Sequence, residues 1–490
     1  MIKCLSVIIS LIFFNINDLT YFQQAHYHIK EHLGYIKHFY KKLLILLSIS
    51  LVLSFINLWY LDIVILLLNL IGLKLIYSKK IIKLKYTKRI VRSLVLSFLV
   101  YLLLLSISFR ELLLILNPLI NIIVYLLIIP IEEVIKKYYQ VKALKLLDKI
   151  NPETIAITGS AGKTTTKHIL DTVLSLGYNT LKTPKSYNTI NGISKTINSS
   201  LDKFTEYLIL EFGASYPKDI SKLCKMIKPK YSIITKIGLS HLKTFKTEQN
   251  IIKEKMKLLE NTLELCVINN DDENIRSYIN SKSFKCQIIK VGKSTDSDFV
   301  ISDEIVSKEG ISFKINDTLI SSKLIGEHNI YNLSFVYALI KTIKEEYLNF
   351  QELTDNLILN CFSNLKNVTN RLELKKDLKG NIIIDDSFSS NYTGFINALE
   401  YLKLYENKVL ITPGIVETKK EENKQIAKKI IEVCDKVYVV KSPTGDIIYD
   451  ELIKLKYQNA IKVDSFKDAI SQIHDSTVLI ENDLPDFYYL

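Results

Sequence analysis

The sequence predicts an N-terminal α-helical transmembrane region followed by two α/β domains built on parallel sheets. Three observations lead to this fold class. Four long apolar stretches precede residue 140, and from about residue 150 short apolar runs alternate with helical stretches. Between one such run and one such helix lies a glycine turn that contains a lysine, at residues 158–166. A chain of 490 residues has room for roughly three domains, and we set their boundaries at 1–140, 150–362 and 363–490.

The N-terminal region predicts four membrane spans, because each apolar stretch is close to the roughly 20 residues that a spanning helix needs. The spans are 43–60, 61–77, 93–109 and 112–129. Lysine and arginine gather before the first span, between residues 79 and 92, and after 132, and this pattern places those segments on the cytoplasmic side. A further stretch, 4–22, is either another span or a signal peptide, although Asn15, Asn17 and Asp18 interrupt it. We therefore expect a multi-pass membrane protein with membrane lipid around it.

The net charge and the cysteines bear on the partners of the protein and on the compartment in which it works. We assign the net charge of +13 to lysines at membrane edges, and we expect no nucleic-acid partner because no nucleic-acid motif is present. The six cysteines are scattered without metal-type spacing, so they predict buried thiols in a reducing compartment.

Residues 158–166 (TGSAGKTTT) have the residue types of a phosphate-binding loop. Gly159 and Gly162 let backbone N–H groups face phosphate oxygens, and the following helix presents its positive end to the same anion. Lys163 adds a charge for the β- and γ-phosphates, and Thr164 offers a hydroxyl to Mg²⁺. The general pattern has a glycine where this chain has Ile157, so a glycine turn without a ligand remains the alternative. The candidate nucleotide contacts are Gly159, Ser160, Ala161, Gly162, Lys163, Thr164 and Thr165.

Other polar residues follow the apolar runs of the first α/β domain, where ligands of parallel sheets bind. Glu211 ends one run, and a carboxylate there is a natural magnesium ligand. His241 follows another run, and Lys255 lies on the next helix. Taken singly, Glu211 is equally well a solvated strand end, His241 is more often an ordinary loop histidine, and Lys255 is one more lysine on a polar helix face.

In order along the chain, these residues and several others resemble the motifs of the Mur ligase family, the ATP-dependent amino-acid ligases of peptidoglycan synthesis. The resemblance covers roughly residues 150–490. The matching segments are 158–166, 183–188 (TPKSYN), 211–215 (EFGAS), 234–242 (ITKIGLSHL), Lys255, 269–272 (NNDD), 326–329 (GEHN) with Asn332, Arg371, and 385–388 (DDSF).

The resemblance implies a fold and an activity. It implies a central P-loop ATPase domain on a parallel sheet and a Rossmann-like C-terminal domain. Within the family it is nearest to the members that add D-alanyl-D-alanine to UDP-MurNAc-tripeptide. ATP with Mg²⁺ would phosphorylate the acceptor carboxylate, and the amine would attack the acyl phosphate. The catalytic domains would lie in the cytoplasm beneath the bacterial inner membrane; the oligomeric state is left open.

The resemblance also implies roles for particular residues. Lys163, Glu211, His241 and Lys255 would carry the catalysis. The metal ligands would be Thr164, Glu211, His241 and a carbamylated Lys255. The resemblance implies that ATP is contacted by Asn329, Asn332, Arg371 and Asp386. It implies that Asn188 and Ser215 face the substrate.

Three departures leave alternatives open. No N-terminal UDP-binding domain is evident. The stretch after Ser387 reads FSSN, where the family has a Tyr-Asn-Ala-Asn segment, and residues 481–486 (ENDLPD) replace a Lys-Gly-Ser motif. A Mur-related ligase with another amine or a lipid-linked acceptor, or a non-catalytic membrane scaffold, therefore stays open.

Overall fold

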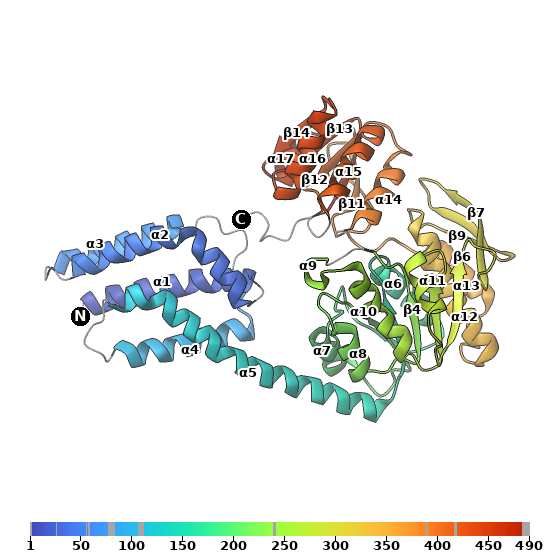
Figure 1. Cartoon of the computed structure of the whole chain (residues 1–490), viewed down its shortest axis with the longest axis horizontal. Helices are drawn as coiled ribbons and strands as arrows, with labels where there is room; N and C mark the ends of the chain where they lie inside the picture. The colour runs from blue at the N-terminus through green and yellow to red at the C-terminus, as the bar shows by residue number, and fades with distance from the viewer. Residues whose placement is uncertain are drawn as a thin grey trace. The chain divides into compact units, whose positions relative to one another are not determined.

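The computed structural model describes residues 2–25, 27–54, 56, 59–76, 84–105, 112–238, 242–388, 391–415 and 419–482. Two compact units are present, a helical unit formed by the N-terminal part of the chain up to Tyr138 and an α/β unit from Tyr139 to Asp483 (Figure 1). Each unit is described by itself below.

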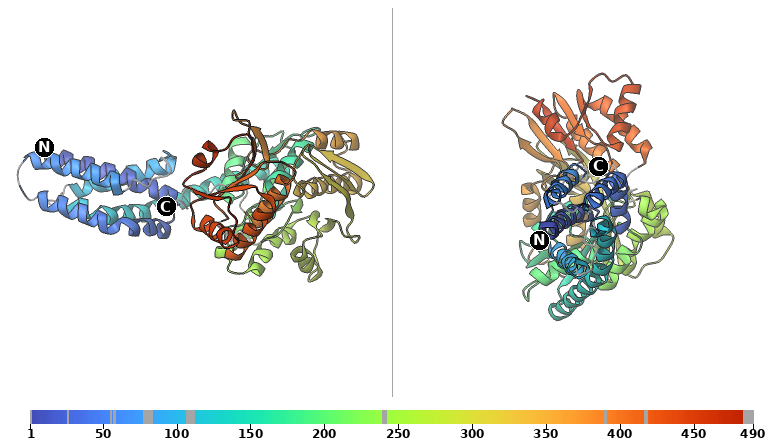
Figure 2. Two further views of the ribbon diagram at one scale, coloured as in Figure 1. Left: turned by 90° about the horizontal axis from the view of Figure 1, so that it is seen from above. Right: turned by 90° about the vertical axis from the view of Figure 1, so that its left-hand side faces the viewer.

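The helical unit consists of long helices that run side by side, drawn in blue to cyan in Figure 2. Their bounds are α1 Ile2–Gln24, α2 Ile29–Ser54, α3 Trp59–Ile76, α4 Lys88–Leu105 and α5 Leu112–Ile150, the last of which continues into the α/β unit. Leu11, Phe14, Phe22, Val124 and Tyr125 belong to the apolar core that the helices share.

Polar groups are built into this core. Asp18 pairs with His32, whose Nε2 lies 3.2 Å from Asp18 Oδ1. The other Asp18 oxygen accepts hydrogen bonds from Tyr125 (2.7 Å) and from Asn121 (2.9 Å). Asn121 in turn accepts a bond from the Tyr101 hydroxyl at 2.8 Å. Asp18, one of the side chains that interrupt the apolar stretches, is therefore bonded to other polar groups inside the unit.

The prediction of a multi-pass membrane protein is wrong. Among the residues that the structure describes, no helix combines the length and the apolar content needed to cross a membrane. The predicted spans do not all coincide with helices, because 43–60 runs past the end of α2 into α3 and 61–77 begins inside α3. The helices also carry charge: α4 starts at Lys88 and includes Arg89 and Arg92, and α3 includes Asp62 and Lys74. The predicted span 93–109 also extends past the described part of α4, and 4–22 lies inside α1.

The first sheet of the α/β unit has nine strands in the order β2-β3-β1-β4-β5-β6-β7-β8-β9. The order places β1 between β3 and β4, and β1 to β6 pair in parallel, whereas β8 is antiparallel to both of its neighbours. The strands are β1 Glu153–Thr158, β2 Thr180–Lys182, β3 Tyr207–Glu211, β4 Tyr231–Ile234, β5 Leu265–Asn269, β6 Gln287–Gly292, β7 Phe299–Val306, β8 Ile311–Ile315 and β9 Thr318–Ser322.

Helices cover both faces of this sheet, which explains the fully apolar strands. In β1, Ile155 and Ile157 face a core completed by α6, α12 and α13, while Ala156 between them faces a core completed by α5, α7, α8, α10 and α11. The helices are α6 Lys163–Leu174, α7 Ile190–Ser200, α8 Asp219–Met226, α9 Leu242–Phe245, α10 Glu248–Asn261, α11 Glu273–Asn280, α12 His328–Glu346 and α13 Asp355–Asn364.

The second sheet has six strands in the order β10-β11-β15-β12-β13-β14, and only β10 is antiparallel to its neighbour. The strands are β10 Glu373–Lys376, β11 Ile382–Asp386, β12 Lys408–Thr412, β13 Lys436–Val440, β14 Ala460–Val463 and β15 Thr477–Glu481. The helices are α14 Tyr392–Leu402, α15 Lys420–Val433, α16 Pro443–Lys454 and α17 Phe466–Ser471. The predicted α/β fold class with two mainly parallel sheets is confirmed.

Candidate functional site

The predicted phosphate loop lies between the end of β1 and the start of α6, and glycine is required at two of its positions. The φ angles of Gly159 and Gly162 are 153° and 83°. A Cβ on Gly159 would lie 1.9 Å from Thr235 Oγ1, and one on Gly162 would lie 2.6 Å from Asn332 Oδ1. The loop is therefore packed too closely against its neighbours to accept any side chain at either glycine.

The end of β4 braces this loop. Thr235 donates from Oγ1 to the Ala161 carbonyl at 2.6 Å. Ser160 donates to the Gly238 carbonyl at 2.9 Å and accepts from the Gly238 N–H at 2.8 Å. These hydrogen bonds tie the loop to the segment that follows β4.

We expect Gly159→Ala to destabilise the chain by about 1–3 kcal/mol and to abolish nucleotide binding, because the new methyl group has no space against Thr235. Thermal unfolding and calorimetric titration with ATP would measure the two effects. Gly238→Ala is the matched control, since the nearest atom to its Cβ would be 3.7 Å away. Equal behaviour of the two variants would contradict the tight packing of the loop.

Lys163 is the first residue of α6, and Gly162 before it provides no side-chain cap, so the first N–H groups of the helix face the loop. The Lys163 ammonium bends back over the loop and donates to the Gly159 carbonyl at 2.8 Å. Burial lowers the pKa of Lys163, the charge of Glu211 opposes this, and the nearby cations Arg371 and Lys167 lower it further. An added anion would relieve this crowding of positive charge.

Glu211, at the end of β3, is the anionic centre of the cluster. Its Oε2 accepts hydrogen bonds from Thr164 Oγ1 at 2.9 Å and from Lys167 Nζ at 3.1 Å. Its Oε1 accepts one from Asn188 Nδ2 at 3.2 Å. Burial alone would raise the pKa of Glu211, but the charges of Lys167 and Lys163 and the bonds from Lys167 and Thr164 hold it below its usual value. Glu211 is thus a carboxylate in the folded protein.

Lys255, on α10, reaches the same loop from the opposite side. Its side chain is buried, with 3% exposed, and its Nζ donates to the Gly159 carbonyl at 2.8 Å. That oxygen is the one to which Lys163 also donates, and two ammonium groups on one oxygen repel each other. Burial first, and then the charge of Lys163, lower the pKa of Lys255 well below its usual value. The geometry therefore favours a neutral amine at this position.

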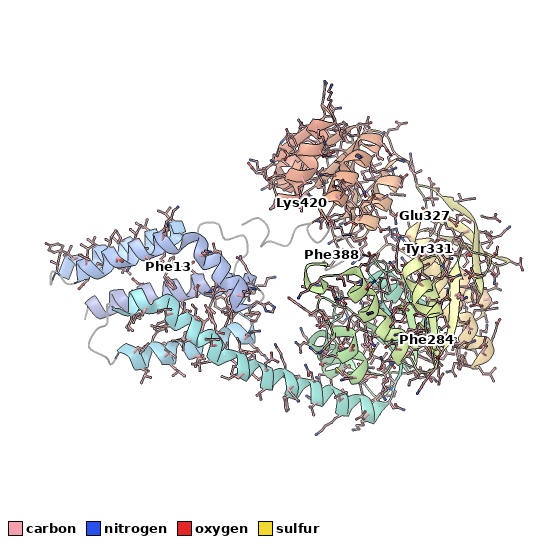
Figure 3. All side chains as sticks on the ribbon, viewed as in Figure 1. Phe13, Phe284, Glu327, Tyr331, Phe388 and Lys420 are labelled. Carbon is pink, nitrogen blue, oxygen red and sulfur yellow. The ribbon has the colours of Figure 1, made fainter. Side chains whose placement is uncertain are left out.

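Asn329 and Asn332, near the start of α12, connect to the loop through the interior of the domain. Asn332 Oδ1 accepts from Thr166 Oγ1 at 3.1 Å, and its Nδ2 donates to Asn329 Oδ1 at 2.8 Å. On the exposed side of this helix end, Glu327 and Tyr331, labelled in Figure 3, bond to Lys293 and Asp271. The start of α12 thus lies beside the candidate nucleotide site.

Two of the predicted nucleotide contacts, Arg371 and Asp386, lie in the second sheet or in the segment that leads to it. The Arg371 guanidinium helps to lower the pKa of Lys163 in the loop and of Lys167 on α6. Burial first, and then the charge of Arg371, lower the pKa of His328 to about 4. Arg371 also lies over the ring of Phe388, 5.7 Å from its centre. Asp386, at the end of β11, accepts the Leu372 N–H at 3.1 Å.

Of the predicted site residues that the structure describes, Ser215 is not brought into the cluster. Ser215 is exposed, and its described bonds involve only its backbone, which accepts from Thr244 and donates to Asp219. His241 lies outside the described residues. Within the described part of the chain, no three His, Cys, Asp or Glu side chains form a metal-binding group.

Sequence reasoning missed Lys167, which is buried and forms the ion pair with Glu211. Its ammonium also donates to the Lys185 carbonyl at 2.6 Å. A signal for it was present, because Lys167 stands four residues after Lys163 and so lies on the same face of the helix. Thr235 lies in the segment 234–242 but was not singled out, and its contact with the loop has no local sequence signal.

The fold and the loop define a nucleotide-binding α/β protein of the phosphate-loop class. Residues 157–340 match the model of the Mur ligase middle domain.

Proteins with similar sequences carry the names of ligases that act on peptides. The chain is 29% identical to a UDP-N-acetylmuramoyl-tripeptide–D-alanyl-D-alanine ligase of Buchnera aphidicola over 54% of this chain and 57% of the relative. The identity to the ligase of the same name from Bacillus subtilis is 27%, over 55% and 58% of the two chains. This chain therefore spans less than two thirds of the length of these relatives.

Solved structures agree on the fold. The MurF ligase of Thermotoga maritima in complex with ADP superposes with a TM-score of 0.62 at 23% identity, over 72% of this chain and 81% of that one. MurF of Acinetobacter baumannii gives a TM-score of 0.61 at 19% identity, over 71% and 77%. The Mur ligase fold is thus established for the α/β unit.

Proposed function

We propose that this protein is an ATP-dependent amide ligase of the MurF type, which joins D-alanyl-D-alanine to UDP-MurNAc-tripeptide through an acyl phosphate. The observation that carries the proposal is the cluster at the phosphate loop, where Lys163, Thr164 and Glu211 converge from α6 and β3. The names of the relatives support the choice of substrates, and the middle-domain match supports the reaction class.

The donor set at the loop fits Mg²⁺. The Thr164 hydroxyl and the Glu211 carboxylate lie 2.9 Å apart, and both are the hard oxygen ligands that this ion prefers. When bound there, Mg²⁺ would neutralise charge on the transferring phosphoryl group. Glu211 and Thr164 would hold the ion, with His241 and Lys255 at a second position, and Lys163 would bind the β- and γ-phosphates.

The remaining predicted residues orient the substrates. Asn329 and Asn332 would contact the adenine side of ATP, since Asn332 is bonded to α6 through Thr166. Arg371 and Asp386 would reach the nucleotide from the C-terminal domain and help to exclude water from the acyl phosphate. Asn188, held on Glu211, would face the acceptor, and we assign Ser215 to the substrate side as well.

We also propose that Lys255 is carbamylated. Its neutral amine can attack CO₂, forming an N–C bond and releasing a proton, and this converts a buried amine into a carboxylate-like metal ligand. The modification would also remove the conflict between two amines on the Gly159 carbonyl.

Lys255→Ala is expected to lower activity at least about tenfold, the lower end of what the loss of a group supporting a metal ligand costs. In wild-type protein, ¹³C-labelled bicarbonate should give a carbamate signal by NMR that is absent in Lys255→Ala. The exposed neighbour Lys253, changed to alanine, is the control. A wild-type spectrum without this signal would refute the modification.

The direct test of function is phosphate release by the full-length chain with ATP, Mg²⁺ and UDP-MurNAc-tripeptide, with and without D-alanyl-D-alanine. We expect release that depends on the dipeptide, and the pentapeptide product by mass spectrometry. Nucleotide binding without turnover would instead favour another amine or a lipid-linked acceptor. A chain that binds no ATP would be the non-catalytic scaffold.

A further inference from the structure

Two buried acids lie side by side at the carboxyl end of the second sheet. Asp386 ends β11 and Glu481 ends β15, and the parallel register pairs these two residues directly. Asp386 is 5% exposed, and Glu481 is not exposed at all. The pair therefore has little access to water that could stabilise two negative charges.

Glu481 lacks a hydrogen-bond donor. Neither of its carboxyl oxygens meets an N–H or O–H among the described residues. Its neighbour within hydrogen-bonding reach is the Asp386 carboxyl group, which on its other side accepts the Leu372 N–H at 3.1 Å. Two carboxylates can bond to each other only if a proton lies between them.

Among the described residues, no cation is found to act on the Glu481 carboxyl group. Burial first, and then the charge of Asp386, raise the pKa of Glu481 well above its usual value. Asp385, the next acid on β11, is bonded to Lys375 at 2.6 Å. The remaining titratable groups on the elements beside β15 are Tyr392, Glu400 and Tyr401 on α14 and Lys408 on β12.

We propose that Glu481 is a positioning residue, which holds one proton between its carboxyl group and Asp386 and so fixes Asp386 for contact with the nucleotide. The contact between Asp386 and the nucleotide rests on the proposed function, whereas the shared proton does not. The Glu481 O–H donates to the Asp386 carboxylate, which remains the anion of the pair. When the proton is lost at high pH, two buried negative charges repel and Asp386 loses its fixed orientation.

The first test needs no activity. The infrared spectrum of the full-length protein at neutral pH should contain a protonated carboxyl band that is missing in Glu481→Gln and that fades as the pH is raised. Glu421→Gln, at an exposed acid, is the control and should leave the difference spectrum flat. A wild-type spectrum identical to that of Glu481→Gln in this region would overturn the shared proton.

The second test separates positioning from packing. The KM for ATP of the wild-type protein should rise with pH as Glu481 ionises, while that of Glu481→Gln, whose amide still donates to Asp386, should stay flat. Glu481→Met has a similar length but no donor, and its KM for ATP should be at least about tenfold higher at every pH. We therefore expect Glu481→Gln to have a lower KM for ATP than Glu481→Met, as a positioning role requires.

Two results would overturn the positioning role. One is the same dependence of KM on pH in the wild-type protein and Glu481→Gln. The other is equal KM values in the glutamine and methionine variants, with both folded by circular dichroism. If the wild-type protein binds no ATP, the proposed function fails and the positioning role fails with it, while the infrared test still decides the shared proton.

Discussion

Replacing Lys163 with alanine is expected to reduce kcat/KM for the ligation at least about thirtyfold, which corresponds to a loss of about 2 kcal/mol of transition-state stabilisation. The Lys163 ammonium lies over the loop, within 2.8 Å of the Gly159 carbonyl, in a buried site where charge interacts strongly. A phosphoryl group in transfer spreads negative charge over its oxygens, and this lysine is positioned to balance it.

The measurement is steady-state phosphate release by the full-length chain at saturating Mg²⁺. Lys225→Ala, at an exposed lysine on α8, is the control and should retain wild-type kinetics. Circular dichroism and thermal unfolding would show that Lys163→Ala is folded, since removing a cation from a crowded cationic site does not weaken the core. Wild-type kinetics in Lys163→Ala would refute the assignment of the site.

Glu211→Gln is expected to abolish ligation and also to destabilise the protein by about 3–5 kcal/mol, the usual cost of removing one partner of a buried ion pair. The side chains of Lys167 and Glu211 are 3% and 2% exposed, so the lysine would be left charged and unpaired in the interior. The amide keeps the volume of the side chain but provides no carboxylate for Mg²⁺.

A double-mutant cycle measures how much the ion pair between Lys167 and Glu211 contributes to stability. Lys167→Met removes the stranded charge, so Glu211→Gln/Lys167→Met should be more stable than Glu211→Gln alone, while activity stays lost. Chemical unfolding measures the first quantity and phosphate release the second. If the double variant is no more stable than Glu211→Gln, the ion pair is not the source of the destabilisation.

The pH dependence of stability follows from the same residue. Because the folded state lowers the pKa of Glu211, its contribution is fully present above the pKa of the unfolded chain and is lost as the pH falls through the folded value. Wild-type protein should therefore lose more stability than Glu211→Gln on acidification below about pH 4.

Local sequence was enough to predict the phosphate loop and most of the parallel strands. The loop needs glycines, a lysine and a threonine within nine adjacent residues, so all of its signal is contiguous. The apolar run before the loop forms the strand β1, Glu153–Thr158, because a strand buried on both faces is apolar throughout. The antiparallel β7, β8 and β9 were missed, since their alternating exposure gives short, weak patterns.

By itself, the sequence determined the fold class of the α/β unit and the chemistry of the loop, because both follow from residue order and spacing. Only the tertiary structure decided which distant groups meet: Lys255 donates to Gly159, Lys167 pairs with Glu211, and Glu481 lies beside Asp386. The tertiary structure also showed which side chains surround Asp18 in the helical unit, namely His32, Asn121 and Tyr125. The physical reason is that hydropathy is a property of a segment, whereas pairing and charge compensation depend on neighbours that folding brings from elsewhere in the chain.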